Sequence, residues 1–283
     1  MSLGILTNVA ATYAENNLNQ TQNSLGKVLQ QLSSGSRINS GADDAAGLAI
    51  SDGLNANEAA LTQSAQNAQN GVGLLQTADG ALAQVTNLLD RATTLATEAS
   101  NGGLTTDQAA AANTEFQSIV TEIGNIGTST NFNSTAVFSS SATSFVVSDG
   151  TTSGTSTFSD TVGALASTGV GTTSAGAAGQ SLAADVLTST TAAATALGHI
   201  TTAVSDVSNQ RGSIGADINQ LNAAANVASS EEVNLSAAQG SISETNYGQA
   251  TSDLAKYQVL SQTGISALSQ ANSVQQEILK LLQ

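Results

Sequence analysis

LSSGSRINSGADDAAGLAI, residues 32–50, is the stretch that decides the architecture of this chain. It contains a short turn, rich in Ser, Gly and Asp, between two segments whose apolar residues have the spacing of a helix. Gly35 ends the first run, where a left-handed or unconstrained backbone is needed, and Ser40 with Gly41 supplies a flexible turn. The segment therefore predicts a connector between two helical parts of one chain.

Charged side chains at this turn are expected to position it. The helix restarts at Asp43 and Asp44, whose carboxylates can accept hydrogen bonds from the free amides of the next first turn. Arg37 is one of only six basic residues in the chain, and it could tie the turn to Asp43, to Asp44 or to another subunit. We therefore predict that Arg37, Asn39, Asp43 and Asp44 form an inter-domain joint.

Apolar residues recur at intervals of seven along two long segments. The first series is Leu54, Leu61, Ala68, Leu75, Leu82 and Leu89, and the second is Val186, Ala193, Ile200, Val207, Ile214, Leu221, Ala228, Leu235 and Ile242. This spacing is typical of a coiled-coil-like seam and predicts two long helices, the first over about residues 44–100.

A third helix is expected after a break at residues 101–103. Thr105 and Gln108 are spaced as a capping box, and apolar residues then recur at intervals of three and four until Gly127 ends the helix. The fold class predicted is mainly α, a long antiparallel helical bundle that forms a coiled-coil-like rod. Residues 1–33 and 243–283 also show helical spacing; we expect them to be largely unfolded in the monomer and to pair on assembly.

The centre of the chain, residues 131–184, is rich in Ser, Thr and Gly. Short β-like runs at residues 145–147 and near Phe158, with a turn at Asp149 and Gly150, predict a small solvent-facing β-hairpin and loop. An alternative role for its hydroxyl groups is to accept O-linked glycans.

Composition excludes several classes of function. With 21 acidic and 6 basic residues the formal charge is −15, so nucleic acid is not expected as a partner. No run of about 18 apolar residues occurs, so no membrane-spanning helix is expected. The amino-terminal segment has no basic residue before Lys27, so it lacks the charged start of a secretory signal peptide.

No catalytic, metal or cofactor site is expected. The chain has no cysteine and a single histidine, His199, for which we predict a surface or packing role. Asp43 and Asp44 are adjacent, so their side chains point in different directions and helix capping is preferred to acid–base chemistry. We therefore predict that the protein is not an enzyme.

The residues of the connector carry a family resemblance. Residues 32–50 resemble a motif of bacterial flagellins, whose usual form is close to LSSGLRINSAKDDAAG, and differ from it mainly at Ser36, Gly41 and Ala42. At the other end ALSQANSVQQEILKLLQ, residues 267–283, is similar to the carboxyl-terminal motif of the family. The resemblance extends over about residues 1–135 and 195–283.

This resemblance implies a structural subunit that polymerises into the flagellar filament for motility. Residues 1–43 with 243–283 would then form the inner tube, and residues 44–242 the outer-tube bundle. It also implies extracellular localisation after type III export without a cleaved signal peptide. The implied partners are copies of the chain, an export chaperone, the filament cap and hook-associated proteins. The alternative is a hook-filament junction protein, which would resemble flagellin at both ends.

The resemblance further implies an innate-receptor contact. In the family an Arg, a Leu and a Glu of the outer bundle are recognised by a Toll-like receptor, and the matching positions are Arg91, Leu95 and Glu115. They lie within LLDRATTLATEA and ANTEF. The alternative is that these three residues pack within the bundle or face solvent.

Overall fold

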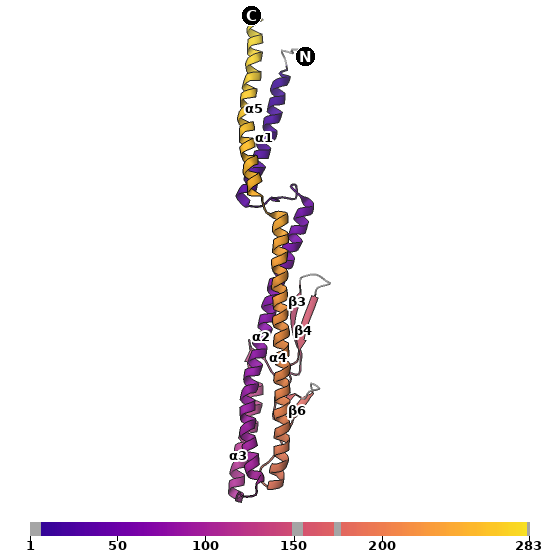
Figure 1. Ribbon diagram of the computed structural model, residues 1–283, viewed down its shortest axis with the longest axis vertical. Helices are drawn as coiled ribbons and strands as arrows, with labels where there is room; N and C mark the ends of the chain where they lie inside the picture. The colour runs from indigo at the N-terminus through magenta and orange to yellow at the C-terminus, as the bar shows by residue number, and fades with distance from the viewer. Residues whose placement is uncertain (1–6, 149–154, 173–176, 282–283) are drawn as a thin grey trace. The chain divides into compact units, whose positions relative to one another are not determined.

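The structure, a computed structural model, describes residues 7–148, 155–172 and 177–281 (Figure 1). Its long helices are α1 (Val9–Ser34), α2 (Ala45–Ser100), α3 (Thr106–Ser129), α4 (Thr190–Ser243) and α5 (Tyr247–Leu281). Antiparallel strand pairs lie between α3 and α4: β1 (Asn131–Phe132) with β2 (Thr135–Ala136), β3 (Thr143–Ser148) with β4 (Thr155–Asp160), and β5 (Val170–Thr172) with β6 (Ala178–Gln180). In the part of the chain so described, no helix is both long and apolar enough to cross a membrane.

The chain divides into two compact units. The first comprises Met1–Ala56 and Asn234–Gln283, and the second comprises Asn57–Val233. The boundaries predicted from the sequence, at residues 43–44 and 242–243, lie inside the first unit, because this unit includes the first turns of α2 and the last turns of α4. The assignment of these parts to an inner and an outer tube stays a prediction.

The second unit is a helical bundle, as the heptad spacing predicts. The long helices α2 and α4 pack antiparallel, and α3 lies beside them (Figure 1). Seam residues of both helices are buried, among them Leu75, Leu82 and Leu89 of α2 and Ile200 and Ile214 of α4. The mainly α fold class is therefore confirmed.

The helix boundaries agree with the prediction at most ends. Thr105 and Gln108 form the predicted capping box, with each side chain bonded to the other's backbone. Two details were wrong. Gly127 does not end α3, which continues to Ser129, and a Cβ at this position would lie 1.9 Å from the Leu165 carbonyl oxygen. This glycine is needed for close packing of the loop at residue 165, not as a helix stop. Val186 precedes α4 and is exposed.

The predicted hairpin is present, but it is not merely solvent-facing. Phe145 of β3 pairs with Phe158 of β4, and both pack against the helical core. The predicted turn residues Asp149 and Gly150 lie outside the described residues. Further along, Val170 and Leu182 are fully buried against the bundle. The sequence did not predict that this segment contributes to the core, because its apolar residues are isolated among Ser, Thr and Gly and do not recur at a regular spacing.

The pairing of α1 with α5 forms much of the first unit. The two helices lie side by side within one chain (Figure 1), and Asn8 joins them by donating its side-chain amide to the Ala271 carbonyl. The structure thus differs from the expectation that these segments are unfolded before assembly. Their burial is nevertheless slight: Ala11 and Val28 are the buried residues of α1. The pair therefore has little core of its own.

Candidate functional site

The connector between α1 and α2 begins where Gly35 ends α1. Gly35 has a φ of 72°, and its N–H donates to the Gln31 carbonyl at 2.9 Å, which closes the last turn of the helix. A side chain here would adopt a strained backbone, and its Cβ would lie 2.9 Å from the Tyr247 hydroxyl oxygen. The left-handed helix end predicted at Gly35 is therefore confirmed.

The connector then pairs with the junction between α4 and α5. Ser36 and Glu244 form an isolated antiparallel bridge, in which the Arg37 N–H donates to the Ser243 carbonyl at 2.7 Å and the Thr245 N–H to the Gly35 carbonyl at 3.0 Å. Ser36 also donates its hydroxyl to the Ser243 carbonyl. Two chain reversals, more than 200 residues apart in sequence, are thus joined by backbone hydrogen bonds.

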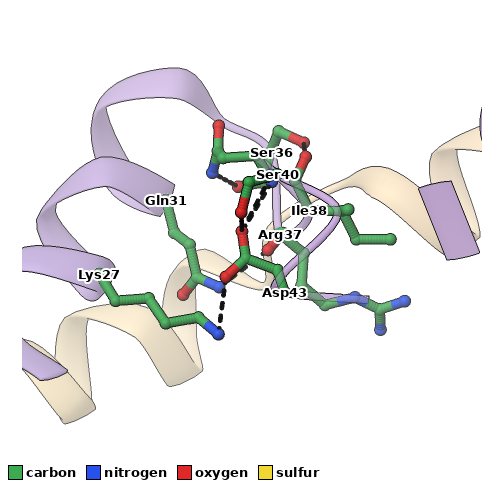
Figure 2. A network of polar contacts seen from close by, with 8 residues as sticks. Lys27, Gln31, Ser36, Arg37, Ile38, Ser40 and Asp43 are labelled. Carbon is green, nitrogen blue, oxygen red and sulfur yellow. Dashed lines mark hydrogen bonds and ion pairs between the residues drawn. The ribbon is translucent and has the colours of Figure 1, made fainter. Parts of the chain in front are cut away.

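Asp43 is the centre of the polar network (Figure 2). Its Oδ2 accepts hydrogen bonds from the Asn39 N–H at 3.2 Å, the Ser40 N–H at 3.0 Å and the Ser40 hydroxyl at 3.1 Å. Its Oδ1 lies 2.8 Å from Nζ of Lys27 in α1. These partners all favour the ionised form, and the hydrogen bond from Lys27 contributes most to lowering the pKa of Asp43 to about 2. Asp43 therefore fixes the turn to α1.

Asp44 has a separate task, which is to cap α2. Its Oδ1 accepts the Gly47 N–H at 2.8 Å, while its carbonyl accepts the first helical hydrogen bond from Leu48. Gly47 is buried beneath this cap. A Cβ at this position would lie 2.5 Å from the Asp44 carboxylate and 2.7 Å from Ile38 Cδ1, so the close packing requires glycine. Of the two adjacent carboxylates, only Asp44 performs the predicted capping role.

Arg37 does not bind either carboxylate. Its Nη2 donates to the Ile242 carbonyl at the end of α4, at 2.5 Å, and the side chain is otherwise exposed. The prediction that it pairs with Asp43 or Asp44 was wrong, because Lys27 occupies that place beside Asp43. A contact with another subunit stays a prediction. Asn39 donates its side-chain amide to the Ser36 carbonyl at 2.8 Å and so holds the turn.

Sequence reasoning missed three contributors to this site. Lys27 supplies the cation for Asp43, Gln31 donates to the Arg37 carbonyl at 2.9 Å, and Thr245 is buried against the end of α1. Lys27 and Gln31 are four residues apart on α1, so one face of that helix serves the connector. One indication in the sequence that Lys27 has a structural role is that basic residues are rare in this chain.

The receptor-like positions lie in the second unit. Arg91 and Glu115 form a two-pronged ion pair between α2 and α3, with Nε to Oε1 at 2.7 Å and Nη2 to Oε2 at 3.0 Å. The Arg91 guanidinium lowers the pKa of the Glu115 carboxyl. Leu95 is only 3 % exposed and belongs to the bundle core. The structure thus brings Arg91 and Glu115 together at the surface and places Leu95 beneath it.

The remaining chemistry-bearing groups serve structural contacts. His199 Nδ1 lies 2.8 Å from Oδ1 of Asp185, just before the start of α4. Over residues 7–148, 155–172 and 177–281, no cluster of three His, Cys, Asp or Glu residues could hold a metal ion. Fold and connector together define a long-helix protein with paired terminal helices, in which polar groups stabilise turns and helix ends.

Comparisons with known proteins name the family. The bacterial flagellin N-terminal helical region matches residues 5–143, and the bacterial flagellin C-terminal helical region matches residues 197–282. A flagellin of Halalkalibacterium halodurans is 33 % identical over 275 residues, covering 97 % of this chain and 98 % of the relative. A flagellin of Listeria monocytogenes is 30 % identical over 297 residues and covers 98 % of both chains.

A Treponema maltophilum protein described as a flagellar filament 30.7 kDa core protein is 29 % identical, covering 97 % of this chain and 98 % of the relative. The crystal structure of Bacillus cereus flagellin has a TM-score of 0.48 and 25 % identity, and covers 62 % of this chain and 94 % of that one. This chain belongs to the bacterial flagellins, a structural protein family.

Proposed function

We propose that this protein is a structural subunit that polymerises into the bacterial flagellar filament for motility. Relatives that match it over nearly their full length are flagellins, and one is described as a filament core protein. The observation that carries the proposal is the apolar surface of the terminal helix pair, because a subunit of a polymer needs apolar surface for its neighbours.

That surface contains large side chains with roughly half their area exposed. On α5 they include Val259, Leu260, Ile265 and Val274, with exposed fractions between 43 and 62 %, and on α1 they include Val9, Tyr13 and Leu29, between 49 and 67 %. Burial of such side chains is worth about 25 cal/mol per Å² of apolar area. Repeated along a polymer, this contribution favours a lattice of identical subunits.

Electron microscopy of the concentrated, purified protein tests the proposal. The wild-type chain should form long filaments, and a Val259→Ser, Ile265→Ser double variant should stay monomeric while keeping its helical circular dichroism. Val227→Ser is the matched control, because Val227 is 56 % exposed on α4 of the second unit. A wild-type chain that never forms filaments under conditions that polymerise other flagellins would contradict the proposal.

Export and localisation follow from the same proposal. The subunit would leave the cell unfolded through the flagellar type III apparatus, without cleavage of a signal peptide, and would be extracellular in the flagellum. The slight burial within the α1–α5 pair supports this, since few tertiary contacts must be broken to free the two ends of the chain. Its partners would be its own copies, an export chaperone, the filament cap and hook-associated proteins. We propose no catalytic activity for it.

The alternative of a hook-filament junction protein differs in copy number. A filament subunit should dominate the protein of sheared filaments, whereas a junction protein should be a minor component. Quantitative mass spectrometry of sheared filaments separates the two. The relatives described above are named as flagellins or filament core proteins, which favours the filament subunit.

Recognition by a Toll-like receptor is a second candidate function. The exposed Arg91–Glu115 pair supports it, since both groups lie at the surface of the bundle. A cell reporter assay should show weaker activation by Arg91→Ala than by the wild-type chain. Equal activation by the two proteins, or none by either, would leave these residues with a purely structural role in the α2–α3 contact.

A further inference from the structure

Two carboxyl groups meet where the β3–β4 hairpin lies against α4. Asp160 is the last residue of β4, opposite Thr143 in the antiparallel register, and Asp217 projects from α4. Each carboxyl group shifts the pKa of the other, so the two side chains lie close together. Asp217 also lines a surface hollow formed by the hairpin and by Gln220 and Ala224 of α4. The contact therefore joins a strand to a helix far away in sequence.

The carboxyl groups of Asp160 and Asp217 have few hydrogen-bond donors around them. The Thr161 N–H donates to the Asp160 carboxylate, but the Oδ2 atom of Asp160 is buried and receives no hydrogen bond from any described donor. A buried acceptor without a donor is costly. A proton on Asp217 would supply a donor for the Asp160 carboxylate, because a protonated carboxyl group can donate a hydrogen bond.

No described cation offsets the two negative charges. The hairpin contacts α2 through Ser64 and Asn67, which are neutral, and β3 itself carries no charged side chain. On α4, the Arg211 guanidinium is bound to Asp79 of α2 at 2.7 Å.

Asp206, the other carboxylate on this part of α4, accepts the Gln180 N–H at 2.9 Å. Among the charged groups of the described residues, Asp160 and Asp217 therefore have only each other as neighbours.

Burial and the neighbouring charge both favour protonation. Burial, followed by the charge of Asp160, raises the pKa of Asp217 to about 6. Burial also raises the pKa of Asp160, while its hydrogen bonds from Thr161 and Asp217 favour its ionised form. Below about pH 6 the proton therefore resides on Asp217, which can donate it to Asp160.

We propose that Asp160 and Asp217 share one proton and form a pH-dependent latch that holds the β3–β4 hairpin against α4. Below about pH 6 the hydrogen bond closes the contact. Above it both groups are ionised, and their repulsion weakens the attachment of the hairpin while the bundle seam, which is apolar, is unaffected. The β3–β4 hairpin thereby responds to acidity independently of the helical core.

The linkage has a defined sign. Asp217 has a pKa of about 6 when the hairpin is attached, against about 4 when it is exposed. The stabilisation is therefore complete below about pH 4 and is lost as the pH rises through 6. Over this interval the opening constant of the hairpin should rise by up to about tenfold per pH unit, and it should level off above the interval.

Hydrogen-exchange mass spectrometry of the full chain between pH 4 and 8 tests the latch, with rates corrected for intrinsic exchange. Peptides covering residues 143–148 and 155–160 should lose protection as the pH rises through 6. Asp217→Asn, which keeps a donor for Asp160 but cannot titrate, should make their protection independent of pH. In Asp160→Asn the loss of protection should move to lower pH, because burial alone then raises the pKa of Asp217. Glu231→Gln, at an exposed position on α4, should retain the wild-type profile.

Peptides from the α2 seam around Leu82 report the bundle as an internal reference and show that each variant is folded. Two outcomes overturn the proposal. One is a hairpin profile that is flat in the wild type or unchanged in Asp217→Asn. The other is a loss of protection that is equal in the hairpin and the α2 seam, since that would be global unfolding and not release of a latch.

Discussion

Lys27 Nζ lies 2.8 Å from Oδ1 of Asp43, so a cation near the end of α1 holds the turn that leads into α2. The same carboxylate accepts two backbone N–H groups and one hydroxyl of the turn. One side chain therefore sets both the shape of the connector and its attachment to the preceding helix.

This carboxylate makes the connector acid-sensitive. Because the pKa of Asp43 is lowered to about 2 in the folded chain, its contribution is present above the unfolded value of about 4 and is lost as the pH falls through 2. Exchange protection of the Asn39 and Ser40 amides should fall across this interval. Asp43→Ala should lower it several-fold already at pH 7, and Lys27→Met should lower it less because the backbone hydrogen bonds remain. Unaltered protection in Asp43→Ala would refute this role.

Substitution of Gly26, inside α1, and of Gly35, at its C-terminal end, should change stability in opposite directions. Gly35→Ala should destabilise the first unit by about 1–2 kcal/mol, since its φ of 72° is strained for alanine, and contact with Tyr247 adds to the cost. Gly26 is inside the helix with no atom near its missing Cβ, so Gly26→Ala should stabilise it by up to about 1 kcal/mol. Urea unfolding followed by circular dichroism gives both values. Equal effects of the two substitutions would contradict the helix-end assignment.

The bundle seam should be the main source of stability in the second unit. Leu82 is completely buried, so Leu82→Ala should cost about 2–5 kcal/mol through lost burial and a cavity. Val227→Ala, at a position 56 % exposed, should change the unfolding free energy by less than about 0.5 kcal/mol. Urea denaturation measures both. A similar cost at the two positions would show that the heptad seam does not dominate.

The terminal helices should be the first part to open. The α1–α5 pair has few buried residues, whereas the second unit has a continuous apolar core. Limited proteolysis of the soluble monomer should remove residues of α1 and α5 well before it cleaves α2 or α4 within residues 57–233. Ends that resist cleavage as strongly as the bundle would show that the pair is stable on its own.

Charge should control the rate of assembly. Each subunit carries a formal charge of −15, so neighbouring copies repel at low ionic strength, and the Debye length falls to about 10 Å at 0.1 M salt. Light scattering during polymerisation should therefore show faster growth in moderate salt than in very low salt. A rate that does not change across the salt series would remove repulsion as the limiting factor.

The sequence predicted the helices because their signals are local and repeated. Heptad spacing identified α2 and α4, and Thr105 with Gln108 identified the start of α3. The motif at residues 32–50 likewise predicted a connector, since Gly35 and the Asp residues have few other roles at a helix boundary. Partners across the fold were not predictable in this way: Arg37 was assigned to a carboxylate that Lys27 occupies.

By itself, the sequence determined the mainly α fold and the place where the chain turns, because periodicity, caps and a left-handed glycine act within a few residues of each other. The motifs at residues 32–50 and 267–283 indicated the family. Tertiary structure alone decided which side chains meet. It joined Ser36 to Glu244, buried Phe145 and Phe158 against the bundle and set Asp160 beside Asp217. These contacts link distant segments, and their energies depend on burial and on the distance between groups, neither of which has a local pattern in the chain.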